Sequence, residues 1–227
     1  MTPTQAVVFD LDGTLIDSRA DIAAAANHML DVHGFQRLPS DTIAGYVGDG
    51  ARLLVARCTK LREESPELDR LLETFLDYYS EHPTEQTRFM PAALEALDAL
   101  ATLPLAICTN KPRRTTDAVL SALGLVRRFE VVVAGGDFPQ KKPDPEPLLH
   151  IARQLALDPR SLVIVGDGPQ DVECGRAIGA RTVGVEGGII PMDRLVAAQP
   201  DQLIPSLADL PALITRWRIA AAASGTG

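Results

Sequence analysis

The chain has 227 residues, enough for one substantial domain and a smaller insertion, and 46% of them are hydrophobic, which suffices for a packed core. Its 30 acidic residues outnumber 22 basic ones, and the net charge of -8 disfavours nucleic acid and acidic membrane surfaces as partners. The sequence shows neither a targeting pattern nor an apolar segment able to span a bilayer, so we expect a cytoplasmic protein. The three cysteines and four histidines lack paired metal-ligand spacing, which indicates buried thiols and ordinary surface or helix histidines.

The first predicted element is an apolar run that starts at residue 7 and ends in Asp10, Leu11 and Asp12 before Gly13. The run is too short for a core helix, which predicts a buried strand whose end carries the acids, where open α/β sheets bind ligands. Alternation along an extended chain places Asp10 and Asp12 on one side. Carboxylates without a basic neighbour in the sequence indicate a metal ion, although an acidic turn is the alternative, since Asp and Gly are common in turns.

Residues 15–88 show helical patterns and nothing typical of a strand. Ser18 and Asp21 have the spacing of a capping box that opens the first helix. Apolar residues at helical spacing before and after a glycine-rich loop at 46–52 predict further helices. We therefore expect an inserted all-helical domain.

Beyond residue 88, short apolar strands alternate with helices. The expected strands are 105–108, 131–133, 162–165, 182–185 and a short edge strand at 203–204. The expected helices are 91–101, 113–123, 145–155, 172–178 and a terminal helix capped by Ser206, with fraying expected from Ala220 onward. This alternation predicts an α/β fold, a Rossmann-like parallel sheet with helices on both faces, made of residues 1–14 and 89–227. Right-handed crossovers bring the ends of the strands to one edge.

Polar residues follow the strand predicted at 105–108 and precede the helix predicted at 145–155. Thr109 and Asn110 can bind phosphate oxygens with their side chains and neighbouring amides, or can simply cap the next helix. Lys141 and Lys142 precede prolines that hold the segment extended. A fixed ammonium there suits a phosphate in a transition state, although a solvated lysine pair is the commoner arrangement.

Two further acids follow the strand predicted at 162–165. Asp167 stands at the strand end and Asp171 lies one turn into the next helix, so both can face one cavity. Carboxylates completed by water and phosphate oxygens are the ligands that magnesium prefers. An acid that only stabilises a helix N-terminus is the alternative for Asp171.

These residues resemble, in order, the four signatures of the haloacid dehalogenase superfamily of phosphotransferases. The matching segments are Asp10-Leu11-Asp12-Gly13-Thr14, Thr109, Lys142 before Pro143, and Gly166-Asp167-Gly168-Pro169-Gln170-Asp171. Gly168 departs from the pattern, because relatives often have Ser or Thr there, and a hydrogen bond to a ligand carboxylate is lost. The resemblance implies that residues 15–88 are a helical cap that closes over the active site.

The resemblance also implies phosphoryl transfer through an aspartyl-phosphate. Asp10 is then the nucleophile, and Asp12 is the general acid and base. Mg²⁺ is expected as cofactor, bound by Asp10, the backbone carbonyl of Asp12, Asp167 and, through water, Asp171. The transferred phosphate oxygens are expected to contact Thr109, Asn110 and Lys142.

One loop of the predicted cap is the candidate for substrate specificity. Gly48 and Gly50 let the backbone approach a small substrate at a helix N-terminus, and Asp49 lies between them. Arg52 can pair with a substrate carboxylate. A simple interhelical turn is the alternative.

The opening string, the cap loop and the segments Thr109-Asn110-Lys111 and Lys142-Pro143-Asp144-Pro145 are similar to the phosphoglycolate phosphatases, which implies hydrolysis of 2-phosphoglycolate to glycolate and phosphate. The alternatives are another small ester, such as a sugar phosphate or N-acetylmuramic acid 6-phosphate, a β-phosphoglucomutase-like phosphomutase, and a non-catalytic binding module. Dehalogenases lack the second acid, here Asp12, and the cap offers only Lys60 for the Schiff base of a phosphonoacetaldehyde hydrolase. The expected partner is a small phosphorylated metabolite, and the expected state is a monomer or homodimer.

Overall fold

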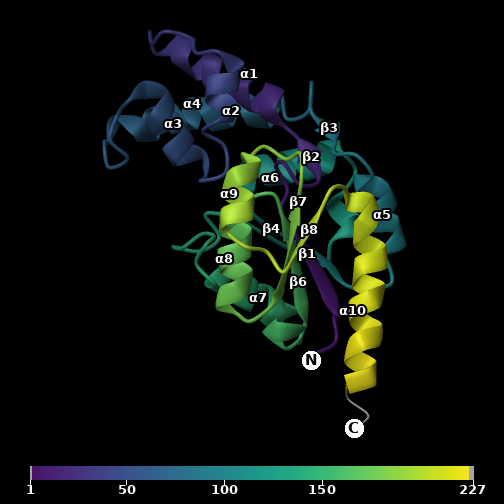
Figure 1. The fold of residues 1–227 in the computed structure, drawn as a ribbon. Helices are drawn as coiled ribbons and strands as arrows, with labels where there is room; N and C mark the ends of the chain where they lie inside the picture. Colours follow the sequence, from purple (N-terminus) through teal and green to yellow (C-terminus); the bar gives the residue numbers. More distant parts are fainter. Residues whose placement is uncertain (1, 225–227) are drawn as a thin grey trace.

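The computed structural model describes residues 2–224, in which parallel strands and surrounding helices build an α/β core (Figure 1). The strands of the main sheet are β1 (Ala6–Phe9), β4 (Leu105–Pro112), β5 (Val131–Gly135), β6 (Leu162–Gly166), β7 (Arg181–Val185) and β8 (Gln202–Ile204). Within the described residues they form one six-stranded sheet in the order β5-β4-β1-β6-β7-β8, and every neighbouring pair is parallel. The predicted Rossmann-like fold is confirmed.

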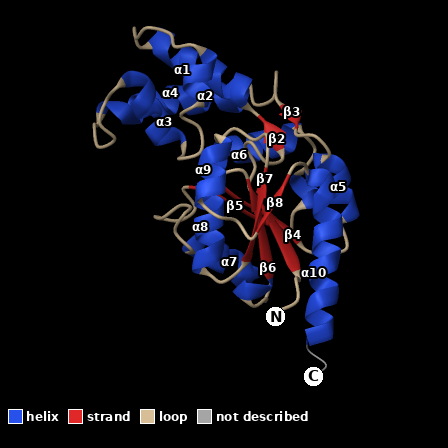
Figure 2. Cartoon of the chain, viewed as in Figure 1, coloured by secondary structure: helices blue, strands red, loops and turns tan. Residues whose placement is uncertain are grey.

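Helices cover both faces of this sheet (Figure 2). They are α5 (Ala93–Ala99), α6 (Arg113–Ala122), α7 (Glu146–Gln154), α8 (Pro169–Ala177), α9 (Met192–Ala197) and α10 (Leu210–Ser224), with single 3₁₀ turns η1 (Val126–Arg128), η2 (Pro159–Ser161) and η3 (Leu207–Asp209). Helix α9 has no counterpart among the predicted elements. The fraying expected from Ala220 is wrong as far as Ser224, because α10 continues to that residue, and 225–227 lie outside the described residues.

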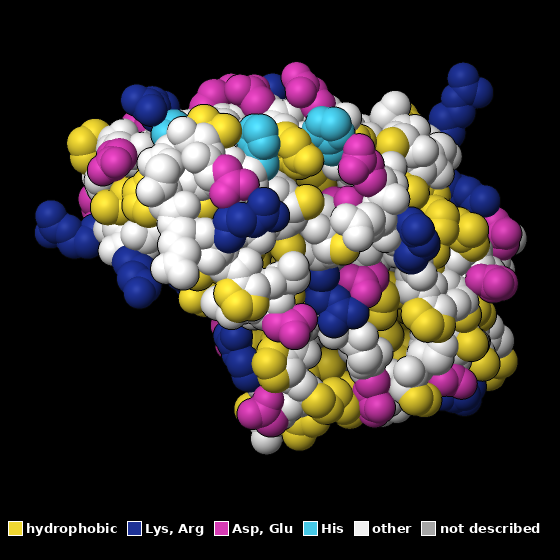
Figure 3. Space-filling view, turned by 90° about the horizontal axis from the view of Figure 1, so that it is seen from above, with side chains coloured by type: hydrophobic (Ala, Val, Ile, Leu, Met, Phe, Trp, Pro, Cys, Tyr) yellow, Lys and Arg dark blue, Asp and Glu magenta, His cyan; other side chains and the backbone are white. Residues whose placement is uncertain are grey.

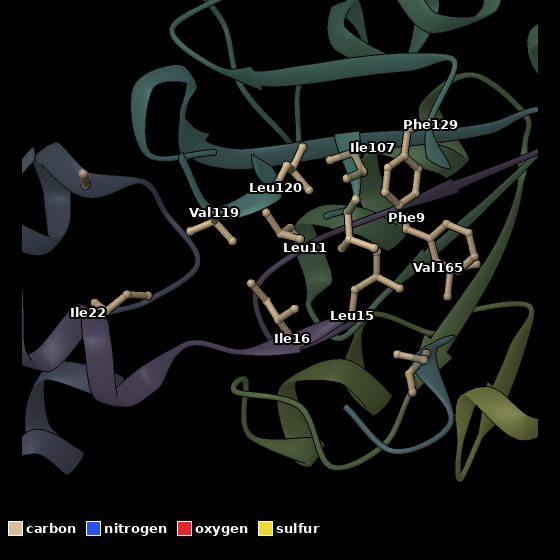
Figure 4. Close-up of a cluster of buried hydrophobic side chains, with 14 of the residues drawn as sticks. Phe9, Leu11, Leu15, Ile16, Ile22, Ile107, Val119, Leu120, Phe129 and Val165 are labelled. Carbon is tan, nitrogen blue, oxygen red and sulfur yellow. The ribbon is translucent and has the colours of Figure 1, made fainter. Parts of the chain in front are cut away.

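Alternate side chains of β1 enter two hydrophobic cores, one on each face of the sheet. Val7 and Phe9 join the core beneath α5, α6 and α10, whereas Ala6 and Val8 join the core beneath α7 and α8. Figure 4 shows Phe9 among side chains from neighbouring elements in the first of these cores. A strand buried on both faces explains the unbroken apolar run that precedes Asp10.

The segment between β1 and α5 forms a helical cap above the edge of the sheet (Figure 1). Its helices are α1 (Arg19–Val32), α2 (Ser40–Ala44), α3 (Ala51–Thr59) and α4 (Glu67–Glu81). The segment also contains β2 (Ile16–Asp17), which pairs antiparallel with β3 (Arg88–Phe89), so the expectation that it holds nothing strand-like is wrong at this point. The start and the end of the cap lie side by side there, and their backbones satisfy each other's hydrogen bonds.

The capping box expected from Ser18 and Asp21 does not form. Ser18 precedes α1, yet its hydroxyl donates to Asp12 Oδ1 at 2.6 Å instead of accepting from the helix. The Asp21 carboxylate accepts from the backbone N–H groups of Gln86 and Thr87 and from the Thr87 hydroxyl. Both side chains are therefore used for tertiary contacts, one at the acid site and one where the cap returns to the core.

Acidic and basic side chains are interspersed over the face of the molecule that carries the cap (Figure 3). None of the helices within residues 2–224 combines the length and apolar character that crossing a bilayer requires.

Candidate active site

The carboxyl ends of β1, β4 and β6 meet beneath the cap, at the point where the strand order reverses around β1. Asp10 directly follows β1, and its backbone N–H donates to Val165 O at 2.9 Å, which anchors it beside the end of β6. Asp167 directly follows β6. A reversal point of this kind opens a crevice for ligands in parallel α/β sheets.

Three carboxylates cluster in this crevice. Each of Asp10, Asp167 and Asp171 offers a carboxylate oxygen, and these oxygens lie within 4.8 Å of one another. The three residues are buried, with 7%, 1% and 2% of their surface exposed. Burial, followed by the charges of Asp10 and Asp171, raises the pKa of Asp167 to about 7. Burial also raises the pKa of Asp171, against the opposing effect of Lys142. The cluster is therefore short of positive charge.

Lys142 supplies part of that charge. Its ammonium lies 2.6 Å from Asp171 Oδ1 and 3.0 Å from Asp10 Oδ1, and it donates to the carbonyl of Cys108 at 2.5 Å. Burial opposes the charge on this side chain, but Asp10 and Asp171 outweigh it and raise the pKa of Lys142 well above its ordinary value. One ammonium thus balances one of three carboxylates. Lys141, its neighbour, is exposed.

The acid cluster fits a divalent cation on two observations. Asp10 Oδ1 is buried and accepts no hydrogen bond of good geometry from the described residues, despite its nearness to Lys142. The carboxylates of Asp167 and Asp171 also lie directly against glycine backbone, because a Cβ at Gly13 or Gly166 would be 2.2 Å from one of their oxygens, so only glycine admits them to this cluster. Gly13 additionally has a φ of +87°, which disfavours any other residue. Oxygen donors of this kind suit hard cations.

Thr109 and Asn110 lie within β4, which runs on to Pro112, so they stand on extended backbone rather than in a turn before the next helix. Thr109 is 5% exposed, and its hydroxyl accepts from the backbone N–H of Lys111. The Asn110 amide nitrogen donates to the carbonyls of Gly48 and Lys142 at 3.1 and 3.0 Å. Asn110 therefore joins the cap loop to the segment that carries Lys142.

Asp12 has partners that the sequence interpretation did not identify. Both of its carboxylate oxygens accept from Lys111 Nζ, at 3.1 and 3.2 Å, and Oδ1 also accepts from Ser18. Lys111 donates in turn to the Tyr79 hydroxyl of helix α4 at 2.5 Å. Burial opposes the charge of Lys111, but Asp12 and Tyr79 outweigh it and raise the pKa of Lys111. Because side chains alternate along a strand, the two-residue spacing of Thr109 and Lys111 could have indicated that their side chains lie on the same side of β4.

A small cavity lies between the cap and the strand ends, and both Asp10 and Asp12 line it. The strand-end wall also includes Thr109, Asn110 and Lys111. The cap wall is largely apolar and is formed by Ile22, Val47, Gly48, Gly50, Ala51, Leu54, Phe75 and Tyr79. The cap thus lies over the acids and leaves a small, partly open space next to them.

Two residues of the predicted specificity loop turn to other partners. Asp49 forms an ion pair with Arg57 at 2.7 Å, and Arg52 forms one with Asp69 at 2.6 Å. Neither Asp49 nor Arg52 belongs to the cavity lining, whereas Gly48 and Gly50 do. A role for Arg52 in binding a substrate carboxylate stays a prediction.

The space that a side chain at position 168 would need is taken by Gln170. A Cβ at Gly168 would lie 2.4 Å from the amide nitrogen of Gln170, which is 8% exposed. The backbone N–H of Gly168 donates to Asp171 Oδ2 at 3.2 Å, so this carboxylate keeps a partner at that position.

Known proteins are similar to this chain in sequence and in fold. A phosphoglycolate phosphatase from Neisseria meningitidis is 40% identical over 215 residues, which cover 91% of this chain and 92% of that protein. An N-acetylmuramic acid 6-phosphate phosphatase from Pseudomonas aeruginosa is 37% identical over 188 residues, 82% of this chain and 83% of that protein. The crystal structure of a predicted phosphoglycolate phosphatase from Haemophilus somnus has a TM-score of 0.84 at 28% identity, covering 94% of this chain and 99% of that one.

A family match covers the part of the chain that carries the acids. Residues 7–185, from β1 to β7, match the family described as haloacid dehalogenase-like hydrolase. The match spans the acid cluster, Lys142 and the whole cap. The chain therefore belongs to the haloacid dehalogenase-like hydrolases and is a phosphatase of that family.

Proposed function

We propose that this chain is a Mg²⁺-dependent phosphomonoester hydrolase that converts 2-phosphoglycolate to glycolate and phosphate. The observation that carries the proposal is the small covered cavity that both Asp10 and Asp12 line, next to the acid cluster. The relative from Neisseria meningitidis, a phosphoglycolate phosphatase, supports the choice of substrate.

The proposed reaction has two steps, which use the two acids in turn. A carboxylate oxygen of Asp10 attacks phosphorus, the bond between phosphorus and the ester oxygen breaks, and Asp12 gives the leaving alkoxide its proton. Asp12, now ionised, takes a proton from water as this attacks the aspartyl-phosphate. Phosphate leaves, and both acids return to their starting states.

The residues around Asp10 suit this chemistry. Asp10, Asp167, Asp171 and the backbone carbonyl of Asp12 would hold Mg²⁺, which when bound lowers the repulsion between a carboxylate and a phosphate dianion. Lys142 and Thr109 would contact the transferred oxygens, and Asn110 would hold the loop that carries Lys142 in place. The docked cap keeps bulk water from the first step.

The lining of the cavity favours a short substrate with an anionic end. Ile22, Leu54 and Phe75 offer no hydrogen bonds to the several hydroxyls of a sugar. Helix α3 begins at Ala51, after Gly50, and its free N–H groups suit the carboxylate of glycolate.

The substrate is tested by phosphate release from a panel of 2-phosphoglycolate, sugar phosphates, N-acetylmuramic acid 6-phosphate and pyrophosphate, each with Mg²⁺ or with EDTA. We expect Mg²⁺-dependent release with the highest kcat/KM for 2-phosphoglycolate. A higher kcat/KM for the amino-sugar ester, as the name of the Pseudomonas aeruginosa relative suggests, would replace the substrate and keep the reaction. Isomerised sugar phosphate without free phosphate would indicate a phosphomutase instead.

Metal binding is tested separately from activity. We expect Mg²⁺ at about 100 times its dissociation constant to raise the free energy of unfolding by about 2.7 kcal/mol, because it binds the carboxylate cluster of the folded chain and not the unfolded chain. Urea unfolding with Mg²⁺ and with EDTA measures the difference. Asp167→Asn should abolish it, whereas Asp31→Asn, which removes an exposed acid paired with Arg37, should not. Equal stabilisation of both variants would contradict the assigned site.

A further inference from the structure

A polar side chain of the cap is linked to Asp12 by hydrogen bonds through one residue of the core, Lys111. We infer that Tyr79, acting through Lys111, positions Asp12 for proton transfer when the cap is docked. The inference rests on the proposed role of Asp12 as general acid and base. Tyr79 and Lys111 are positioning residues in this arrangement, because they act on the substrate through the Asp12 carboxylate.

The bonds of Lys111 account for the whole ammonium group. Its three N–H donors face three acceptors, the two carboxylate oxygens of Asp12 and the Tyr79 hydroxyl. The Lys111 side chain is 2% exposed and Tyr79 is 1% exposed, so water does not compete for these positions. The hydroxyl of Ser18, which precedes α1, also donates to Asp12 Oδ1. The carboxylate is therefore held by two side chains.

The two ends of this chain of bonds belong to different parts of the fold. Tyr79 lies in α4 of the cap, whereas Lys111 and Asp12 lie at the ends of β4 and β1 in the core. The same helix meets the core through Arg114 of α6, which forms ion pairs with Glu73 and Asp77. The Tyr79 hydroxyl thus reaches Lys111 when α4 is docked on α6.

Cap docking consequently has an effect on the acid itself as well as on water access. When α4 leaves the core, Lys111 loses one acceptor and its ammonium meets solvent, so Asp12 is held less firmly. Proton transfer is then coupled to the state in which water is excluded from the phosphorus. The aspartyl-phosphate forms efficiently with the cap in place.

Tyr79→Phe tests this arrangement, because it removes the hydroxyl and keeps the ring that packs against Phe75. We expect kcat for 2-phosphoglycolate to fall about 10- to 100-fold with KM within about twofold, a part of the roughly 10²–10⁴ that general acid–base catalysis supplies. Single-turnover release of nitrophenolate from p-nitrophenyl phosphate should change by less than about twofold, because that leaving group needs no proton. Lys111→Met should show the same selective loss, and a larger one.

Tyr78→Phe is the matched control, since Tyr78 is the neighbouring residue of α4 and its ring stacks on His28, outside the cavity lining. It should leave both reactions unchanged. Equal losses for both esters in Tyr79→Phe, or a raised KM with unchanged kcat, would overturn the inference in favour of a structural or substrate-binding role. If wild-type protein does not hydrolyse 2-phosphoglycolate, the proposed substrate fails, and the same comparison is made with the alkyl phosphate that the panel identifies.

Discussion

Replacing Asp10 by asparagine is expected to lower kcat for phosphate release by roughly 10⁴- to 10⁶-fold, the loss typical of removing a catalytic nucleophile. Asparagine keeps the shape of the side chain at this buried position beside Val165, but its amide oxygen carries no negative charge with which to attack phosphorus. The acid that donates the proton, Asp12, stays in place. The loss should therefore appear in kcat for every ester that the wild-type protein hydrolyses.

Initial rates at saturating substrate and Mg²⁺ measure the effect, and circular dichroism confirms that the variant is folded. Asp31→Asn, an exposed acid in the cap, serves as the control and should retain wild-type rates. Turnover by Asp10→Asn within about tenfold of wild type, after exclusion of deamidation by mass spectrometry, would remove Asp10 from the role of nucleophile.

The second large effect is expected from Lys142→Met, which replaces a buried ammonium by an apolar side chain of similar length. Asp10 and Asp171 then keep their places without the cation that lies 3.0 and 2.6 Å away. Removing one partner of a buried ion pair destabilises proteins by about 3–5 kcal/mol. We expect the free energy of unfolding, measured in EDTA, to fall by this amount. We also expect turnover with Mg²⁺ to be lost, because the ammonium faces the transferred phosphate in the proposed mechanism.

Urea unfolding measures the loss of stability, and Lys141→Met is the control. Lys141 is exposed and donates to the backbone carbonyl of Asp49 in the cap loop, so its loss should change stability by less than about 1 kcal/mol. If the two variants were destabilised equally, the assignment of the buried charge to Lys142 would be wrong. The comparison is direct, because the two lysines are adjacent in the chain.

The core of the fold could be predicted because its signals are local. The strand β1 is buried on both faces, so its four residues are all apolar and the first polar residues mark its end. The same reasoning placed Asp167 after β6. Right-handed crossovers then brought these ends together without any knowledge of side-chain contacts. The acid cluster follows from this regularity.

Contacts between the cap and the core could not be predicted, because residues far apart in sequence make them. Tyr79 lies among the buried apolar positions of α4, yet its hydroxyl accepts from Lys111, 32 residues later. Ser18 and Asp21 have a capping pattern, and tertiary partners outweigh it in the folded chain. Local spacing identifies which residues can cap a helix, but it does not show what else competes for them.

The short ribbon formed by β2 and β3 makes the cap a modular part of the molecule. Ile16 pairs with Phe89, so the chain leaves the core and returns to it at one place. The closure entropy of an inserted segment grows slowly with its length, and adjacent ends place few demands on what lies between them. Caps of different size or lining can therefore be exchanged at this junction while the sheet and its acids stay as they are. A new substrate specificity can therefore evolve in such a protein through changes in one contiguous stretch of sequence.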